Sequence, residues 1–157
     1  MKNLRTSVLC FIVSIFTLVA NAQNNSIPVN EPDYSKPRLF ENLPDQIPIN
    51  IGIINGLLSA QIGSTVDMNL TDGVAFNFKG EVVSAAAKFQ NSMTSVVIRS
   101  SNFNGARFTI TKITDDDGNV NYTGRIISMK NADLYELKNK NGSYVLIKRN
   151  YYDLINE

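Results

Sequence analysis

Short turns separate the strand-forming segments of this chain, and they restrict its fold more than any other feature. After Gly63, segments rich in β-branched and aromatic residues alternate with short links, several of which contain Asn-Gly or Asp-Gly. Short links can join only antiparallel neighbours, because parallel strands need a long crossover. The expected strands lie at about 64–70, 74–87, 93–101, 106–114, 120–129, 133–138 and 143–150. The sequence therefore predicts a mainly β fold, an antiparallel meander of about seven strands.

The segment Ala106–Met129 predicts that this sheet has one polar and one apolar face. Its two strands fold back over the turn Asp115–Asn119, in which Asp-Gly supplies the turn conformation. With symmetric pairing, the polar face carries the pairs Thr109–Arg125 and Thr111–Thr123, and the apolar face carries Phe108–Ile126 and Ile110–Gly124. Such alternation is typical of a half-buried sheet, so we expect Phe108, Ile110 and Ile126 in the core.

One helix is expected over Asn50–Gly63, with Asn50 as N-cap and Gly63 as the C-terminal stop. The apolar residues at helical spacing are Ile51, Ile54, Leu58 and Ile62. Gly52 and Gly56 cost stability inside a helix but suit one that lies close against a sheet. A twisted meander must cover its apolar face, so we expect a curled or barrel-like sheet with this helix packed on it.

The strand segment Ser84–Ala87 is rich in alanine, which is depleted in sheets and fills little volume. It indicates a close approach by the helix or, alternatively, a groove on the sheet surface.

Residues 1–22 have the pattern of a secretory signal peptide. Lys2 and Arg5 precede an apolar core at Val8–Val19, and small residues follow up to Ala22. This core is shorter than the roughly 20 apolar residues of a membrane anchor. We therefore expect export with cleavage, a periplasmic or extracellular location, and no transmembrane span in the mature chain.

The prolines define the next part of the chain. All five lie between residues 28 and 48, and their spacing opposes both helix and sheet ladder. We expect a proline-rich extended leader at 23–37 and a single β-sheet domain at 38–157, since the apolar residues after Arg38 gain from burial.

The composition excludes several kinds of catalytic chemistry. The chain has no histidine, and its single cysteine, Cys10, lies in the expected signal peptide. Histidine-based triads, thiol nucleophiles and histidine-based zinc sites are therefore excluded. We expect no cofactor, and removal of the signal leaves nearly balanced charges that favour no class of partner.

Carboxylates can hydrolyse glycans without histidine, and Glu81, Asp133 and Glu136 are the residues to consider. Positions 133 and 136 point to opposite faces of a strand, and Glu81 falls on a solvent-facing parity. We interpret all three as surface charges that keep the sheet soluble.

The acidic turn could hold a hard cation, with Asp115 and Asp117 as ligands. The alternating aspartates of an EF-hand loop are absent, because position 113 is isoleucine. Aspartate and glycine are also favoured in tight turns for conformational reasons, which is the interpretation that we prefer.

Basic residues alternate with aromatic residues in the second half of the chain, as in sheets that bind nucleic acid. Export separates the chain from most nucleic acid, so we expect none as a partner. The expected polar face could still bind an acidic protein or glycan outside the cytoplasm. Its candidate residues are Arg107, Thr109, Thr111, Thr123 and Arg125.

Three segments carry a resemblance in their turns and strands: SVVIRSSNFNGARFTI, DDDGNVNYTGRIISM and DLYELKNKNGSYVLIKR. Over about Arg38 to Glu157 they resemble small exported β-rich proteins of Bacteroidetes-like bacteria, a group that implies no activity and no functional residues. The pieces that begin at Gly105 and Tyr122 are similar, more weakly, to β-rich regions preceding the catalytic domains of secreted metalloproteases. No HExxH segment is present, so that likeness implies at most a pro-domain-like inhibitor.

These observations favour a non-catalytic exported binding domain of unknown ligand. The alternatives are a carboxylate-based glycan hydrolase, a pro-domain-like protease inhibitor, and a lipocalin-like carrier with an apolar cavity.

Overall fold

The computed structural model describes residues 37–69 and 76–151. The expected signal peptide at 1–22, the expected leader at 23–37 except for Pro37, residues 70–75 and the tail after Tyr151 lie outside the described residues. The expected domain begins close to Arg38, because Leu39 is half-buried and Phe40 is buried.

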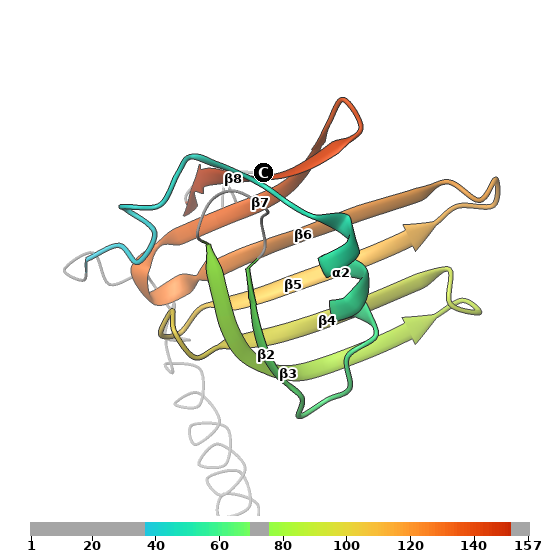
Figure 1. Ribbon diagram of the computed structural model, residues 1–157, viewed down its shortest axis with the longest axis horizontal. Helices are drawn as coiled ribbons and strands as arrows, with labels where there is room; N and C mark the ends of the chain where they lie inside the picture. The colour runs from blue at the N-terminus through green and yellow to red at the C-terminus, as the bar shows by residue number, and fades with distance from the viewer. Residues whose placement is uncertain (1–36, 70–75, 152–157) are drawn as a thin grey trace, which may run out of the picture. The chain divides into compact units, whose positions relative to one another are not determined.

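Eight antiparallel strands form one sheet (Figure 1). They are β1 (Gln46–Pro48), β2 (Thr65–Asn69), β3 (Asn77–Lys88), β4 (Met93–Ser100), β5 (Arg107–Thr114), β6 (Val120–Ser128), β7 (Asp133–Lys140) and β8 (Ser143–Asn150). Their spatial order is β1-β8-β7-β6-β5-β4-β3-β2, with a 3-10 turn η2 (Met129–Asn131) between β6 and β7. The mainly β fold is confirmed, and so is the meander of the seven expected strands.

Two expectations about the sheet need correction. The proline spacing was expected to oppose a ladder, yet Gln46–Pro48 pairs with β8, as proline can at a sheet margin. The sheet is also open rather than closed into a barrel. Its apolar face is covered instead by the helix and by the segment before it, which contribute Phe40, Ile49 and Leu57 to the core.

The helix α2 (Ile51–Leu58) lies across one face of the sheet and contacts β4 and β5 (Figure 1). Asn50 is its N-cap as predicted, and its Oδ1 accepts a 2.8 Å hydrogen bond from the N–H of Gly52. The helix ends at Leu58, before Ile62 and Gly63. The expected glycine contact with the sheet is wrong, because Gly52 and Gly56 are exposed while Ile54 and Leu57 face the core.

The core lies between α2 and the inner face of the sheet, which we define as the face toward α2. Phe108, Ile110 and Ile126 are fully buried there, as predicted. Aromatic rings form a contiguous cluster at one end, with Phe40, Phe76, Phe103 and Tyr135 in edge-on, tilted and stacked contacts. Burial of each large side chain contributes about 1.5–3 kcal/mol, so this cluster is a main source of stability.

The alanine-rich part of β3 does not lie under the helix. A β-bulge between Val82 and Ser84 shifts the register with β4, and all residues from Val83 to Lys88 are exposed. The helix contacts β4 and β5 instead. The predicted close approach of the helix to Ser84–Ala87 is therefore wrong.

Candidate binding surface

The outer face of the sheet, opposite α2, brings together all five residues predicted as a binding surface. The pairs Thr109–Arg125, Thr111–Thr123, Phe108–Ile126 and Ile110–Gly124 face each other as predicted. Arg107 lies at the start of β5, opposite Ile127 on β6 and Arg99 on β4. We call the surface formed by Ser95, Arg99, Arg107, Thr109, Thr111, Thr123 and Arg125 the threonine–arginine face.

Among the described residues, two guanidinium groups of this face have no ion pair, although Arg125 lies opposite Glu136 on β7. Arg99 pairs with Glu81 at 3.2 Å, whereas Arg107 and Arg125 form no ion pair or hydrogen bond within the part of the chain that is described. Arg99 and Arg107 are directly opposite each other, an arrangement that is destabilising for like charges. The centre of the face therefore carries two positive charges, Arg107 and Arg125, that no ion pair neutralises among the described residues.

Hydroxyl groups lie beside these charges. Thr111 Oγ1 donates a 3.0 Å hydrogen bond to Ser95 Oγ, which in turn donates one of 3.1 Å to the carbonyl oxygen of Ile110. Thr123 is exposed next to Thr111, and Thr109 is half-buried beside Arg125. The strand register fixes the backbone positions of these residues, so the hydroxyl groups and the arginine side chains lie side by side on one face.

The neighbouring strands β7 and β8 limit the positive surface. Glu136 on β7 pairs with Lys138 at 2.6 Å and with Arg149 at 3.6 Å. One carboxylate thus serves two cations on these strands, whereas the guanidinium groups on β5 and β6 have no ion pair among the described residues.

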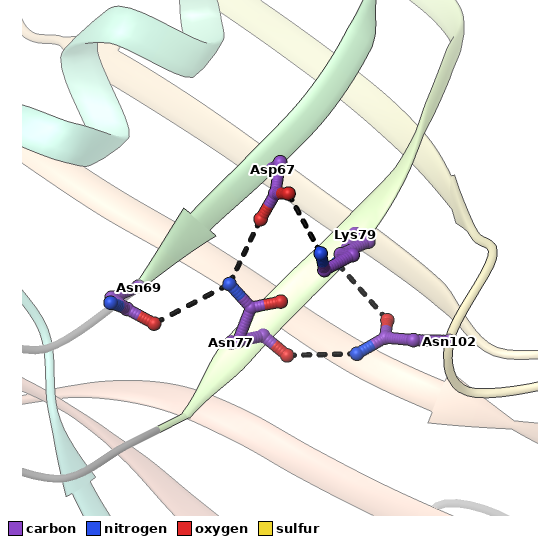
Figure 2. Close-up of polar contacts among 5 residues, drawn as sticks. All are labelled: Asp67, Asn69, Asn77, Lys79 and Asn102. Carbon is purple, nitrogen blue, oxygen red and sulfur yellow. Dashed lines mark hydrogen bonds and ion pairs between the residues drawn. The ribbon is translucent and has the colours of Figure 1, made fainter.

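A second polar cluster lies on β2, β3 and the turn after β4, and Figure 2 shows its five residues. Lys79 Nζ pairs with Asp67 Oδ2 at 2.8 Å, and Asn77 Nδ2 donates to Asp67 Oδ1 at 2.9 Å and to Asn69 Oδ1 at 3.4 Å. Asn102 accepts from the N–H of Lys79 and donates to the carbonyl oxygen of Asn77, at 3.0 and 2.9 Å. The cluster ties three segments of the sheet together.

The same cluster was not predicted from the sequence. Hydrogen bonds from Lys79 and Asn77 hold the pKa of Asp67 below its usual value. Asn77 Oδ1 is buried and has no hydrogen-bond partner among the described residues, while Asn77 Nδ2 donates to two acceptors. The residues of the cluster lie within 35 positions of one another in the sequence, but their spacing matches no known motif. Their proximity becomes apparent only from the pairing of β2 with β3.

The three carboxylates considered for catalysis differ in their exposure to solvent and in their partners. Glu81 and Glu136 are partly exposed and ion-paired on the outer face. Asp133 is only 5% exposed, so its interpretation as a surface charge is wrong. It lines a cavity of about 280 Å³ together with Arg38, Phe40, Glu41, Leu134, Lys148 and Arg149. Its carboxylate accepts the N–H of Leu39, which gives it a structural role.

The acidic turn between β5 and β6 is organised by Asp115. Its carboxylate accepts hydrogen bonds from the N–H of Asn119 at 2.7 Å and from Asn119 Nδ2 at 3.0 Å, and these bonds lower its pKa. Gly118 has a φ of +83°, which explains glycine at this position. Among residues 37–69 and 76–151, no three acidic side chains lie together in a way that could hold a metal ion, and this applies to Asp115 and Asp117 as well.

Comparison of the chain with protein-family models, with curated proteins and with solved structures found no match. Within the described ranges, no helix is long and apolar enough to cross a membrane.

Proposed function

We propose that the chain is a non-catalytic exported binding domain whose threonine–arginine face binds an anionic glycan outside the cytoplasm. The observation that carries this proposal is Arg107, which lies opposite Arg99 without an acidic partner among the described residues. An anion placed there would relieve the repulsion between the two guanidinium groups. The N-terminal segment and the missing histidine support export and a role other than catalysis.

A glycan fits this face better than a compact anion does. Arg107 and Arg125 lie on neighbouring strands of a regular sheet, so their charges are spread along a surface. The hydroxyls of Thr109, Thr111 and Thr123 lie between and beside them. Sulfate or carboxylate groups of a sugar chain would pair with arginine, while sugar hydroxyls would exchange hydrogen bonds with threonine.

The test is calorimetric titration with heparin, used as a defined sulfated polysaccharide, at low and at high salt. Binding should weaken with salt, because exposed charges are screened. Arg107→Gln and Arg125→Gln should each reduce affinity by about tenfold or more, since a charge-assisted hydrogen bond contributes about 1.5–3 kcal/mol.

Lys138→Gln is the matched control, because it removes one positive charge that Glu136 already compensates on the same face. It should leave affinity within about twofold of the wild type, the range typical of compensated surface charges. Absence of heparin binding at low salt would overturn the glycan proposal. Equal losses in Lys138→Gln and Arg107→Gln would show that net charge, rather than this face, determines binding.

A further inference from the structure

The second half of β3 is an open margin of the sheet. β2 pairs with β3 only from Thr65–Glu81 to Asn69–Asn77, and beyond the bulge Ser84–Lys88 pairs only with β4 in the part of the chain that is described. In Figure 1 this half of β3 runs past β2 along the lower margin of the sheet. All six residues Val83–Lys88 are exposed, including those on the face toward α2. One row of backbone N–H and C=O groups is thus available to another strand.

Between the bulge at Val82/Ser84 and Lys88, this margin carries neither a charge nor a proline. Its side chains are small and uncharged except for Lys88 at one end. Natural edge strands are normally shortened, charged, interrupted by proline or covered. The opposite margin shows such protection, because β1 has only three residues and ends in Pro48. The edge strand β2 has five residues, so within the described ranges Val83–Lys88 is the longest run open for pairing at either margin.

Exposed apolar side chains lie at both ends of this run. Phe89, in the turn that follows Lys88, is 73% exposed, and Val83 and Ile62 at the other end are 36% and 64% exposed. Ile62 is near Val83 because the N–H of the next residue, Gly63, donates to the carbonyl oxygen of Val82 at 2.8 Å. The turn holds Phe89, Gln90 and Asn91 at positive φ, a conformation that residues with a Cβ rarely adopt.

We propose that two copies of the chain pair in antiparallel fashion along Val83–Lys88 and form a symmetric dimer. With Ala86 on the twofold axis, Ala85 faces Ala87 and Ser84 faces Lys88, so no like charges meet. The same register brings Phe89 of each copy to the end that carries Val83 and Ile62 in the other. The exposed apolar groups at the two ends are therefore complementary in an antiparallel pair.

A second copy is the occupant that the two margins favour. Because the same run of residues is used in both copies, the pairing is isologous and closes after two copies rather than propagating into a fibre. The small side chains of Ala85–Ala87 let the two backbones approach without displacing side chains. Residues opposite each other in an antiparallel pair share a face, so the dimer would extend the sheet and present both outer faces on one side.

The test is sedimentation velocity on the protein that a bacterial host produces from the full-length sequence. The wild type should be a dimer, whereas Ala86→Lys and Ala86→Glu, which place like charges on the axis, should each dissociate at least about tenfold more readily. An equimolar mixture of the two variants should regain the dimer, because opposite charges then meet. Ser143→Lys, at the exposed start of β8, is the matched control and should remain dimeric.

Each variant should fold, because Ala86 is exposed and its substitution leaves the core intact. Circular dichroism checks that it does. A wild type that is monomeric up to about 100 μM would overturn the proposal, even if the margin binds an added extended peptide. It would equally be overturned if folded Ala86→Lys remained a dimer or if the mixture of folded variants stayed monomeric.

Discussion

Asp133 on β7 accepts a hydrogen bond of 2.6 Å from the backbone N–H of Leu39, which lies 94 residues earlier in the chain. This bond attaches the segment before α2 to the sheet and places Phe40 in the core. Burial raises the pKa of Asp133, while the N–H groups of Leu39 and Phe40 and the charges of Arg38 and Lys148 act against that rise. Desolvation is the largest of these effects, so the folded state favours the protonated form of Asp133 more than the unfolded chain does.

The first prediction concerns the pH dependence of this carboxyl. Its folded pKa lies above the ordinary value of 3.8, so its stabilising contribution is complete below pH 3.8 and is lost as pH rises through the folded pKa. The free energy of unfolding of the wild type, relative to Asp133→Asn, should therefore fall over that range. Urea unfolding at a series of pH values measures it. Asp116→Asn, in an exposed turn, is the control, and a relative stability of the wild type that rises with pH would contradict the prediction.

The second prediction concerns Tyr135, whose hydroxyl donates a 2.6 Å hydrogen bond to the carbonyl oxygen of Pro44. Tyr135→Phe keeps the ring contacts with Phe40 and Phe76 but leaves that carbonyl without its donor. The variant should lose about 1–2 kcal/mol of unfolding free energy. Burial also raises the pKa of Tyr135 well above its ordinary value. An alkaline absorbance titration should therefore show one tyrosine that ionises only on unfolding, and this signal should be missing in Tyr135→Phe.

The third prediction concerns the turn at Asp115. Hydrogen bonds from Asn119 favour its charged form and hold its pKa below 3.8. Stability from this turn should be present above pH 3.8 and lost as pH falls through the lowered pKa. Carboxyl chemical shifts in an acid titration followed by NMR measure it directly. Asp115→Asn should remove the low-pH transition and broaden the Asn119 amide signal, whereas Asp117→Asn should do neither.

The alternation of residues predicted the sheet well, because period 2 is a strong local constraint. The pairing of Thr109 with Arg125 and the burial of Phe108 follow from one hairpin turn and the two-residue repeat. The five residues of the predicted polar face therefore lie together as expected.

Features that depend on distant segments were predicted poorly. Asp133 is buried where it accepts the hydrogen bond from Leu39, and Ile47 lies in a strand because β1 pairs with β8. Both contacts join residues that are about a hundred positions apart in the sequence. The bulge at Val83 moves the alanine segment away from the helix, and a single inserted residue in a strand leaves no clear signal in the sequence. Local patterns therefore predicted the faces of the sheet and the helix that covers one of them, whereas the margins of the sheet and the contact of Leu39 with Asp133 depend on distant segments.

The last prediction compares two glycines that the sequence does not distinguish. A Cβ at Gly124 would lie 2.5 Å from the carbonyl oxygen of Thr109 on the paired strand, whereas a Cβ at Gly56 in α2 would meet nothing within 4 Å. Gly124→Ala should therefore force β5 and β6 apart and destabilise the fold by about 1–3 kcal/mol or more, as overpacking does. Gly56→Ala should stabilise it by about 0.5–1 kcal/mol, because alanine favours the helix. Urea unfolding of both variants gives the comparison, and destabilisation of Gly56→Ala would show that this side of α2 is packed in solution.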